Sequence, residues 1–179
     1  MTVPRPSQFD PPLATTFSAI FLEEVSLKAN ADFDPDKGEG GFGVGFGFCV
    51  MRTKENPLRR QVHLRLGVLM LEDSDLTPYS GDIQVFTQVT VDRDVGAAEI
   101  DLAVAWAAVS ALVGSVRTHL DALTAIGPHP RLNLSPVNAE RVLREASVVG
   151  VDGKAIYRLV DGPKARPSEA KRNRSGQRA

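Results

Sequence analysis

The chain has 179 residues, of which 42% are hydrophobic and 24% charged, enough for one globular domain with its own core. No apolar run approaches the length needed to span a bilayer, and residues 1–12, with four prolines, lack the apolar segment of a signal peptide. Cys49 is the single cysteine, which excludes an intrachain disulfide and favours a reducing compartment such as the cytoplasm.

Charge is divided unevenly along the chain. Residues 164–179 hold six basic residues and one acid, whereas the rest holds 15 bases and 21 acids. An acidic body is a poor ligand for nucleic acid, because phosphate contacts need clustered lysine and arginine. We therefore expect no nucleic-acid partner, a disordered segment over 1–14 and a disordered basic tail over 162–179.

Four runs of alternating hydrophobicity predict four β-strands, over residues 16–29, 41–51, 62–71 and 83–91. They follow one another in the chain, mostly through turn-like links. Strands in this order favour an antiparallel sheet.

The second of these runs is unusual, because glycine occupies every other position. Gly41, Gly43, Gly45 and Gly47 alternate with bulky apolar residues, so one face of the strand is bare backbone. Glycine weakens a strand, and its presence indicates a close backbone approach, a bulge or a ligand.

After Gly96 the period changes to that of a helix. The pattern predicts about seven turns of helix, ended by Gly127 and Pro128. A short second helix is expected over 136–146, capped by Ser135, and a hairpin extension over 148–161. The regular stripe on the long helix resembles a helix–helix seam. It consists of Leu102, Trp106, Val109, Val113, Val116 and Leu120.

No catalytic or metal-binding pattern has the context it needs. Residues 38–43 match G-x-G-x-x-G, but a strand follows instead of the helix that would receive phosphates. Asp32, Asp34 and Asp36 alternate as in a calcium loop, without the glycine and glutamate that such a loop requires. The three histidines lack metal-ligand spacing, and Cys49 is interpreted as a buried, inert thiol. A Ser-His-Asp triad assembles in space, but no nucleophile-elbow context points to one. We therefore expect no enzyme, no metal and no cofactor.

Residues 131–138, Arg-Leu-Asn-Leu-Ser-Pro-Val-Asn, resemble the L-N-L-x-P-V-N motif that leads into the last helix of SecB-type export chaperones. Residues 20–30 are similar to the first strand of that family, and Arg117 stands where the family has an arginine in its long helix. The resemblance covers residues 17–146. It implies an α+β domain over 15–147 with a four-stranded antiparallel sheet, one long helix and one short helix.

The resemblance also implies a function. Proteins of this family are cytoplasmic, ATP-independent chaperones that assemble as dimers of dimers and bind unfolded polypeptides in apolar grooves. The stripe on the long helix would then form the seam of a homotetramer. Client contacts would be made by Phe33, Val44, Phe46, Leu132, Leu134, Val142 and Leu143.

Two partners beyond the client are compatible with the resemblance. The motor SecA is one, although Lys28 occupies a position where the family usually has an acid that helps to bind it. An antitoxin is the other, because diverged SecB-like proteins shield unstable antitoxins. Two alternatives of other classes remain: an enzyme with a pocket under the sheet, and a self-assembling structural protein that packs through its glycine-faced strand.

Overall fold

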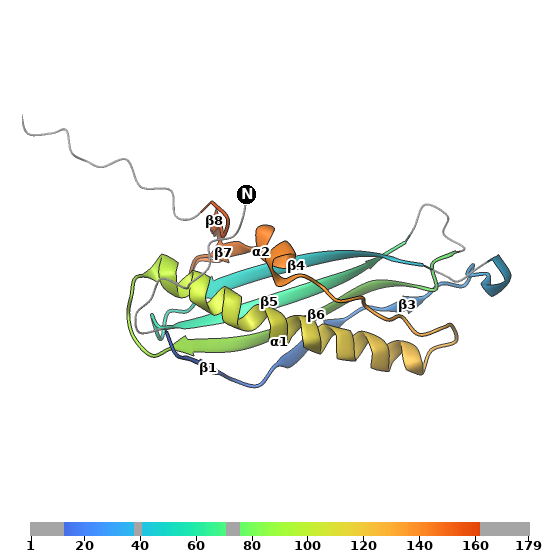
Figure 1. Cartoon of the computed structure of the whole chain (residues 1–179), viewed down its shortest axis with the longest axis horizontal. Coiled ribbons are helices and arrows are strands. Elements are labelled where there is room, and N and C mark those ends of the chain that lie inside the picture. The colour runs from blue at the N-terminus through green and yellow to red at the C-terminus, as the bar shows by residue number, and fades with distance from the viewer. Residues whose placement is uncertain (1–12, 38–40, 71–75, 162–179) are drawn as a thin grey trace, which may run out of the picture.

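The computed structural model describes residues 13–37, 41–70 and 76–161. It is a mixed α and β fold in which one long sheet packs against one long helix (Figure 1). The elements are β1 (Thr15–Phe17), β2 (Phe21–Val25), β3 (Lys28–Ala29), a 3-10 turn η1 (Pro35–Lys37), β4 (Gly43–Arg52), β5 (Arg59–Leu69), β6 (Tyr79–Val91), α1 (Ala97–Ala125), α2 (Ala139–Arg144), β7 (Ser147–Val149) and β8 (Ala155–Arg158).

The sheet is larger than the sequence predicts. Eight strands lie in the order β1-β6-β5-β4-β7-β8, and β2 and β3 also pair with β6. Pairing is antiparallel except between β4 and β7, which run parallel. The prediction of an α+β fold with one long and one short helix is confirmed. The prediction that the sheet has four strands, all antiparallel, is wrong. The hairpin predicted around residues 152 and 153 is present as β7 and β8, and β7 extends the main sheet.

The expected first strand, 16–29, is broken into three pieces along β6. At the breaks, serine hydroxyls replace strand ladder bonds: Ser18 Oγ accepts from the Gln88 amide at 3.0 Å, and Ser26 Oγ accepts from the Asp82 amide at 3.2 Å. Gly81 has φ +134°, and a Cβ there would lie 2.3 Å from the Ser26 carbonyl oxygen. Only glycine allows this close approach of the two backbones.

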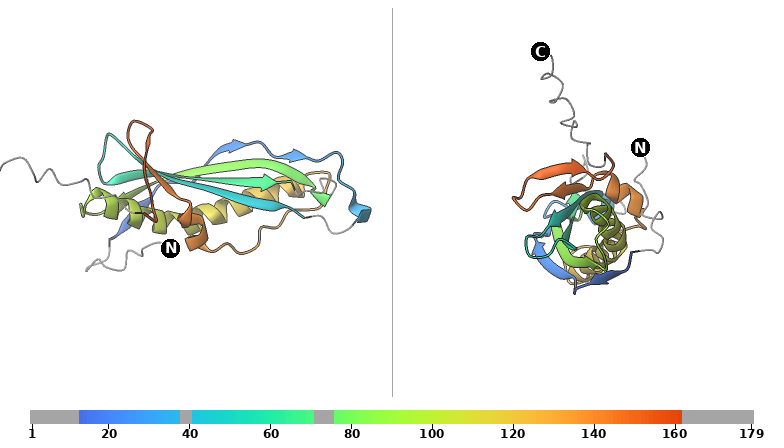
Figure 2. Two further views of the ribbon diagram at one scale, coloured as in Figure 1. Left: turned by 90° about the horizontal axis from the view of Figure 1, so that it is seen from above. Right: turned by 90° about the vertical axis from the view of Figure 1, so that its left-hand side faces the viewer.

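Helix α1 lies inside the curve of the sheet, as the end-on view shows (Figure 2). Most of its contacts are with β6 and β5. Val109, Val116 and Leu120 are fully buried in this single chain, Val113 is nearly so, and only Leu102 and Trp106 are half-exposed. The stripe assigned to a subunit seam therefore packs on the chain's own sheet. A 3.6-residue period shows that a helix buries one face, but not which surface covers it.

The outward face of α1 carries small residues instead. Its exposed positions include Ser110, Ala111, Gly114, Thr118 and Ala122. By length and composition alone, α1 could cross a membrane, since its most apolar stretch has a mean hydropathy of 1.6. The expectation from the sequence that no apolar run approaches the length of a membrane span is therefore wrong for α1. Core helices of soluble proteins pass the same test, and half of this stretch is buried in the structure.

The short helix α2 begins later than the sequence predicts. Asn138, not Ser135, is its N-cap, and the Asn138 side chain accepts a hydrogen bond from the Glu140 amide at 2.8 Å. Residues 130–138 run extended from the end of α1 to this cap. The predicted tail, 162–179, and most of the predicted disordered segment, 1–14, lie outside the described residues.

An ionic cluster around the buried Asp101 joins α1 to β4, β5 and β8. The Asp101 carboxylate of α1 is fully buried and pairs with Arg60 of β5 and with Arg52 of β4 at 2.7 Å. The Tyr157 hydroxyl of β8 donates to the same carboxylate at 2.8 Å. One acid thus holds the helix, the main sheet and the β7–β8 hairpin together.

Candidate functional site

A groove of about 480 Å³ lies beside β4, and we call it the β4 groove. One wall is the N-terminal half of β4, and the other is the extended segment that leads into α2. Its lining residues are Gly41, Phe42, Val44, Phe46, Asn133, Leu134, Ser135, Pro136, Val137, Asn138 and Arg141.

The wall opposite β4 is held in place by α1 and β6. The Tyr79 hydroxyl donates to the His129 carbonyl at 3.0 Å, and Thr124 Oγ1 accepts from the Leu132 amide at 3.1 Å. Leu132 and Leu134 are each 4% exposed, so alternate side chains of this segment anchor it in the core. Farther along, Arg117 donates to the Ser135 carbonyl at 3.0 Å. The groove therefore has a fixed wall before any ligand arrives.

The other wall is an edge strand with an open side. β5 pairs with β4 over its whole length, Gly43–Arg52, but β7 pairs only with Cys49–Met51. Among the described residues, no strand pairs with the remaining edge from Gly43 to Phe48. Such an edge offers backbone donors and acceptors to another extended chain.

Apolar side chains of β4 change from buried to half-exposed along the strand. Val50 is 0% and Phe48 2% exposed, whereas Phe42, Val44 and Phe46 are only partly buried. The arrangement can therefore accept an extended peptide, with hydrogen bonds at the edge and apolar contacts alongside it.

Three of the seven predicted client residues line the groove: Val44, Phe46 and Leu134. Val142 and Leu143 are 2% and 0% exposed, because α2 turns them into the core, and Leu132 is buried beside them in the same cluster. Phe33 lies elsewhere, 8% exposed, with its ring edge-on to His129 at 5.0 Å between centroids.

Sequence reasoning missed several lining residues. Phe42 shares the alternation of Val44 and Phe46, so the pattern already contained it. Val137 and Arg141 were missed because α2 was expected to begin at residue 136, which would put them on the helix in a different orientation.

Arg141 is the one charged residue among those that line the groove. It is exposed, and its guanidinium makes no hydrogen bond or ion pair with any residue that the structure describes. The neighbouring Glu140 carboxylate instead lies 3.5 Å from Arg144. The groove thus has an uncommitted cation at its α2 end.

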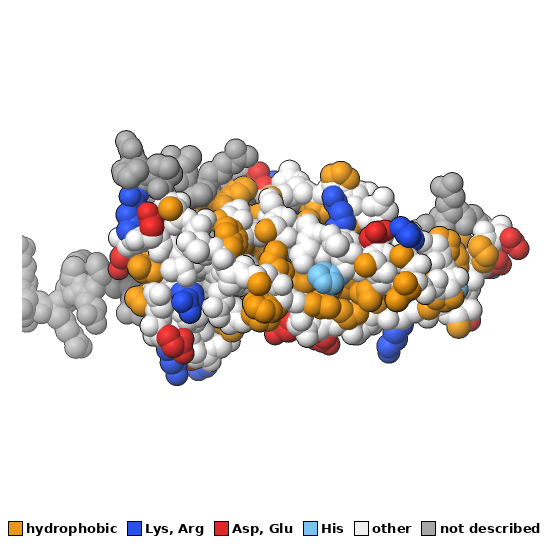
Figure 3. Space-filling view, turned by 90° about the horizontal axis from the view of Figure 1, so that it is seen from below, with side chains coloured by type: hydrophobic (Ala, Val, Ile, Leu, Met, Phe, Trp, Pro, Cys, Tyr) orange, Lys and Arg blue, Asp and Glu red, His pale blue; other side chains and the backbone are white. Residues whose placement is uncertain are grey.

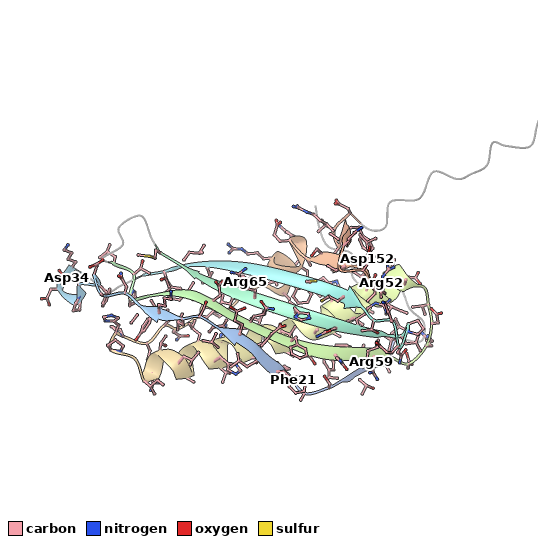
Figure 4. All side chains as sticks on the ribbon, turned by 180° about the vertical axis from the view of Figure 1, so that it is seen from behind. Phe21, Asp34, Arg52, Arg59, Arg65 and Asp152 are labelled. Carbon is pink, nitrogen blue, oxygen red and sulfur yellow. The ribbon has the colours of Figure 1, made fainter. Side chains whose placement is uncertain are left out.

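The glycine face of β4 points away from α1, on the side of the sheet seen in Figure 4. A Cβ at Gly45 or Gly47 would have its nearest neighbour at 3.8 or 3.7 Å, which is ordinary contact. Of the three explanations that the sequence left open for these glycines, a close backbone approach is therefore ruled out at Gly45 and Gly47 among the described residues. Beside this strip, Arg65 and Asp82 form a two-bond ion pair at 2.8 and 2.9 Å, which lowers the pKa of Asp82.

On this outer face, β2 is tied to the sheet by Glu23. Its carboxylate accepts from Gln84 at 2.6 Å and lies 2.9 Å from His63 Nδ1. Cys49 is half-buried opposite His63, and burial raises the pKa of its thiol. The prediction of a buried thiol is therefore only partly correct, and its inertness stays a prediction, which the raised pKa favours because less thiolate forms at neutral pH.

Comparison with solved structures relates this fold to known proteins. The structure is similar to the Mycobacterium tuberculosis Rv1957 SecB-like chaperone, solved in complex with a ChAD peptide from the Rv1956 HigA1 antitoxin. The TM-score is 0.54 at 17% identity, over 69% of this chain and 91% of that one. The chain has a SecB-like fold. The resemblance found in its sequence is therefore confirmed at the level of the fold.

The other comparisons add little. A protein of unknown function from Streptococcus agalactiae aligns with a TM-score of 0.43 and 12% identity, over 69% of this chain and 98% of that one. No protein-family model matches the sequence. No curated protein matches it either.

Proposed function

We propose that this protein is an ATP-independent chaperone that holds unfolded polypeptide segments in the β4 groove. The observation that carries the proposal is the combination of half-exposed apolar residues with an unpaired strand edge in one groove. The solved complex of the structurally similar Rv1957 with a peptide supports it. The protein acts by binding alone, without a catalytic residue, cofactor or metal, and works in the cytoplasm.

Binding is driven by two contributions that need no particular client sequence. Apolar side chains of the client leave water, at about 25 cal/mol for each Å² of apolar surface. The client backbone forms hydrogen bonds along the free edge of β4, as in other cases of strand addition. Ordering an unfolded segment costs free energy, so each site binds weakly and several sites per assembly are needed.

A light-scattering assay tests the proposal directly. The protein should suppress aggregation of a chemically denatured substrate in the absence of nucleotide. Val44→Asp with Phe46→Asp should abolish suppression, since charge in the groove opposes burial of apolar side chains. The matched control is Ile156→Asp, which changes a residue 49% exposed on β8, outside the groove. Suppression that survives in the double variant would contradict the groove assignment.

We further propose an antitoxin-like client rather than a role in export through SecA. The antitoxin peptide bound to Rv1957 supports the first role. Lys28 argues against the second, because it lies exposed in β3 where the resemblance expects an acid for SecA. Co-sedimentation with SecA should show no complex, whereas a complex at micromolar concentration would favour export.

We propose a homotetramer as the working assembly, although through other residues than the stripe. Seen from below, the molecule presents a broken band of hydrophobic side chains along much of its length (Figure 3). β1, β2 and their link contribute five exposed large hydrophobic residues: Phe17, Ile20, Phe21, Leu22 and Val25. The exposed apolar residues of β1, β2 and their link, and the small-residue face of α1, are both suited to close packing with other copies.

Sedimentation velocity measures the assembly. Gly114→Leu should dissociate it, because a bulky side chain would separate helices packed through that face. Apart from the backbone of α1 itself, no atom of the described residues lies within 4 Å of a Cβ at this position, so we expect the fold to tolerate the change. A tetramer that survives would place the interface elsewhere.

A further inference from the structure

Resting on the proposed function, we propose that the β4 groove selects an extended client segment with an acidic side chain at one end, which pairs with Arg141. The groove has two distinct ends, because α2, which contains Arg141 and is capped by Asn138, lies away from the start of β4 (Figure 1), and Gly41 and Phe42 directly precede that start. Its charge is therefore placed asymmetrically along the path of the client.

Two observations indicate that Arg141 binds the client and does not stabilise the fold. Its guanidinium has no partner in the part of the chain that the structure describes. Arg144, about one helical turn farther along α2, forms an ion pair with Glu140 instead. The other ten lining residues carry no charge, so an acidic client side chain would meet a cation and no repelling carboxylate among them. Charge complementarity of this kind sets orientation and choice of partner more than overall affinity.

The remaining lining residues define the rest of the ligand. Phe42, Val44 and Phe46 recur every second residue, which suits apolar side chains with the same spacing in an extended client. A client lying along β4 therefore presents alternate apolar side chains and places one carboxylate beside α2. This gives the segment both a pattern and a direction.

Fluorescence anisotropy with synthetic peptides tests the proposal. The probe is a labelled peptide of about ten residues in which valine and phenylalanine alternate with threonine, long enough to follow the open edge. Both termini are blocked, so that a single glutamate supplies the only carboxylate. Glutamate is placed near the amino end in one peptide and near the carboxyl end in another, and each has a glutamine counterpart.

One of the two glutamate peptides should bind about three- to five-fold more tightly than its glutamine counterpart, the effect of one exposed ion pair. The other should show no preference, because the cation lies at one end only. Arg141→Gln should remove the preference, and salt at about 0.5 M should reduce it by screening. The matched control is Arg144→Gln, which removes the same charge from the same helix and should leave the preference intact.

The outcomes separate this inference from the proposed function. If wild-type protein binds glutamate and glutamine peptides equally, and the Val44→Asp, Phe46→Asp variant binds neither, the groove binds peptides but charge selection is refuted. A preference that persists in Arg141→Gln refutes the assignment to Arg141. If no peptide binds to the wild-type protein, both proposals fail.

Discussion

Replacing Asp101 by asparagine should be among the most destabilising single changes outside the apolar core. The side chain keeps its shape but loses its charge, so the guanidinium of Arg60, which is 2% exposed, is left without a counter-ion. Breaking one side of a buried ion pair costs about 3–5 kcal/mol. Arg60 keeps hydrogen bonds to the carbonyl oxygens of Pro57 and Arg59, at 2.6 and 2.9 Å, which favours the lower value.

Urea unfolding at a fixed protein concentration measures this loss. With a dependence on urea of about 2 kcal/mol per molar, 3 kcal/mol moves the midpoint by about 1.5 M. Arg52→Gln serves as a control, because that side chain is 26% exposed and its ion pair is partly screened, so about 1 kcal/mol is expected. An Asp101→Asn midpoint within about 0.5 M of wild type would refute the view that this carboxylate is needed to neutralise Arg60. Peptide binding by the folded variant should not change, since no member of the cluster lines the groove.

Three further predictions follow from other local features. Burial raises the pKa of the Cys49 thiol, so it should react more slowly than glutathione with a disulfide reagent at neutral pH, and an equal or faster rate would contradict this. Burial opposes the charge on Glu23, but hydrogen bonds from Gln84 and His63 lower its pKa below the ordinary 4.5. The contribution of Glu23 to stability is therefore present above pH 4.5 and is lost as the pH falls through the lower pKa of the folded state. Glu23→Gln should make the free energy of unfolding less dependent on pH in this range, and an unchanged midpoint of acid unfolding would argue against this role of Glu23. Gly81→Ala should destabilise by about 2 kcal/mol or more through its positive φ and the nearby Ser26 carbonyl, and a melting temperature within about 2 °C of wild type would contradict this.

Local pattern was sufficient to predict most elements of this fold. Alternation placed the long strands to within about four residues at each end, because side chains on a half-buried strand must alternate. Gly96 and Gly127 bracket α1 as expected. A Cβ at Gly127 would lie 2.3 Å from the Tyr79 hydroxyl, so the glycine is also required by packing.

Features that depend on distant partners could not be predicted in this way. The parallel pairing of β7 with β4 joins segments about 100 residues apart, and nothing in either segment encodes it. The stripe on α1 is equally compatible with a sister subunit or with the chain's own sheet. For the candidate site, the motif over 131–138 located one wall of the groove. It did not predict that Arg141 lines the groove, because that depends on where α2 begins.

The gradient of burial along β4 explains why the groove exists at all. β7 pairs with β4 at Cys49–Met51 and α2 also contacts β4, but among the described residues only an extended segment lies opposite Phe46, Val44 and Phe42. A sheet that is incomplete in this way lacks both a strand and the side chains of that strand. An extended polypeptide supplies both at once, whereas a folded helix satisfies its own backbone groups and presents side chains with the wrong period. The preference for unfolded segments that we propose therefore rests on the open strand edge itself, and needs no particular side chain of the client.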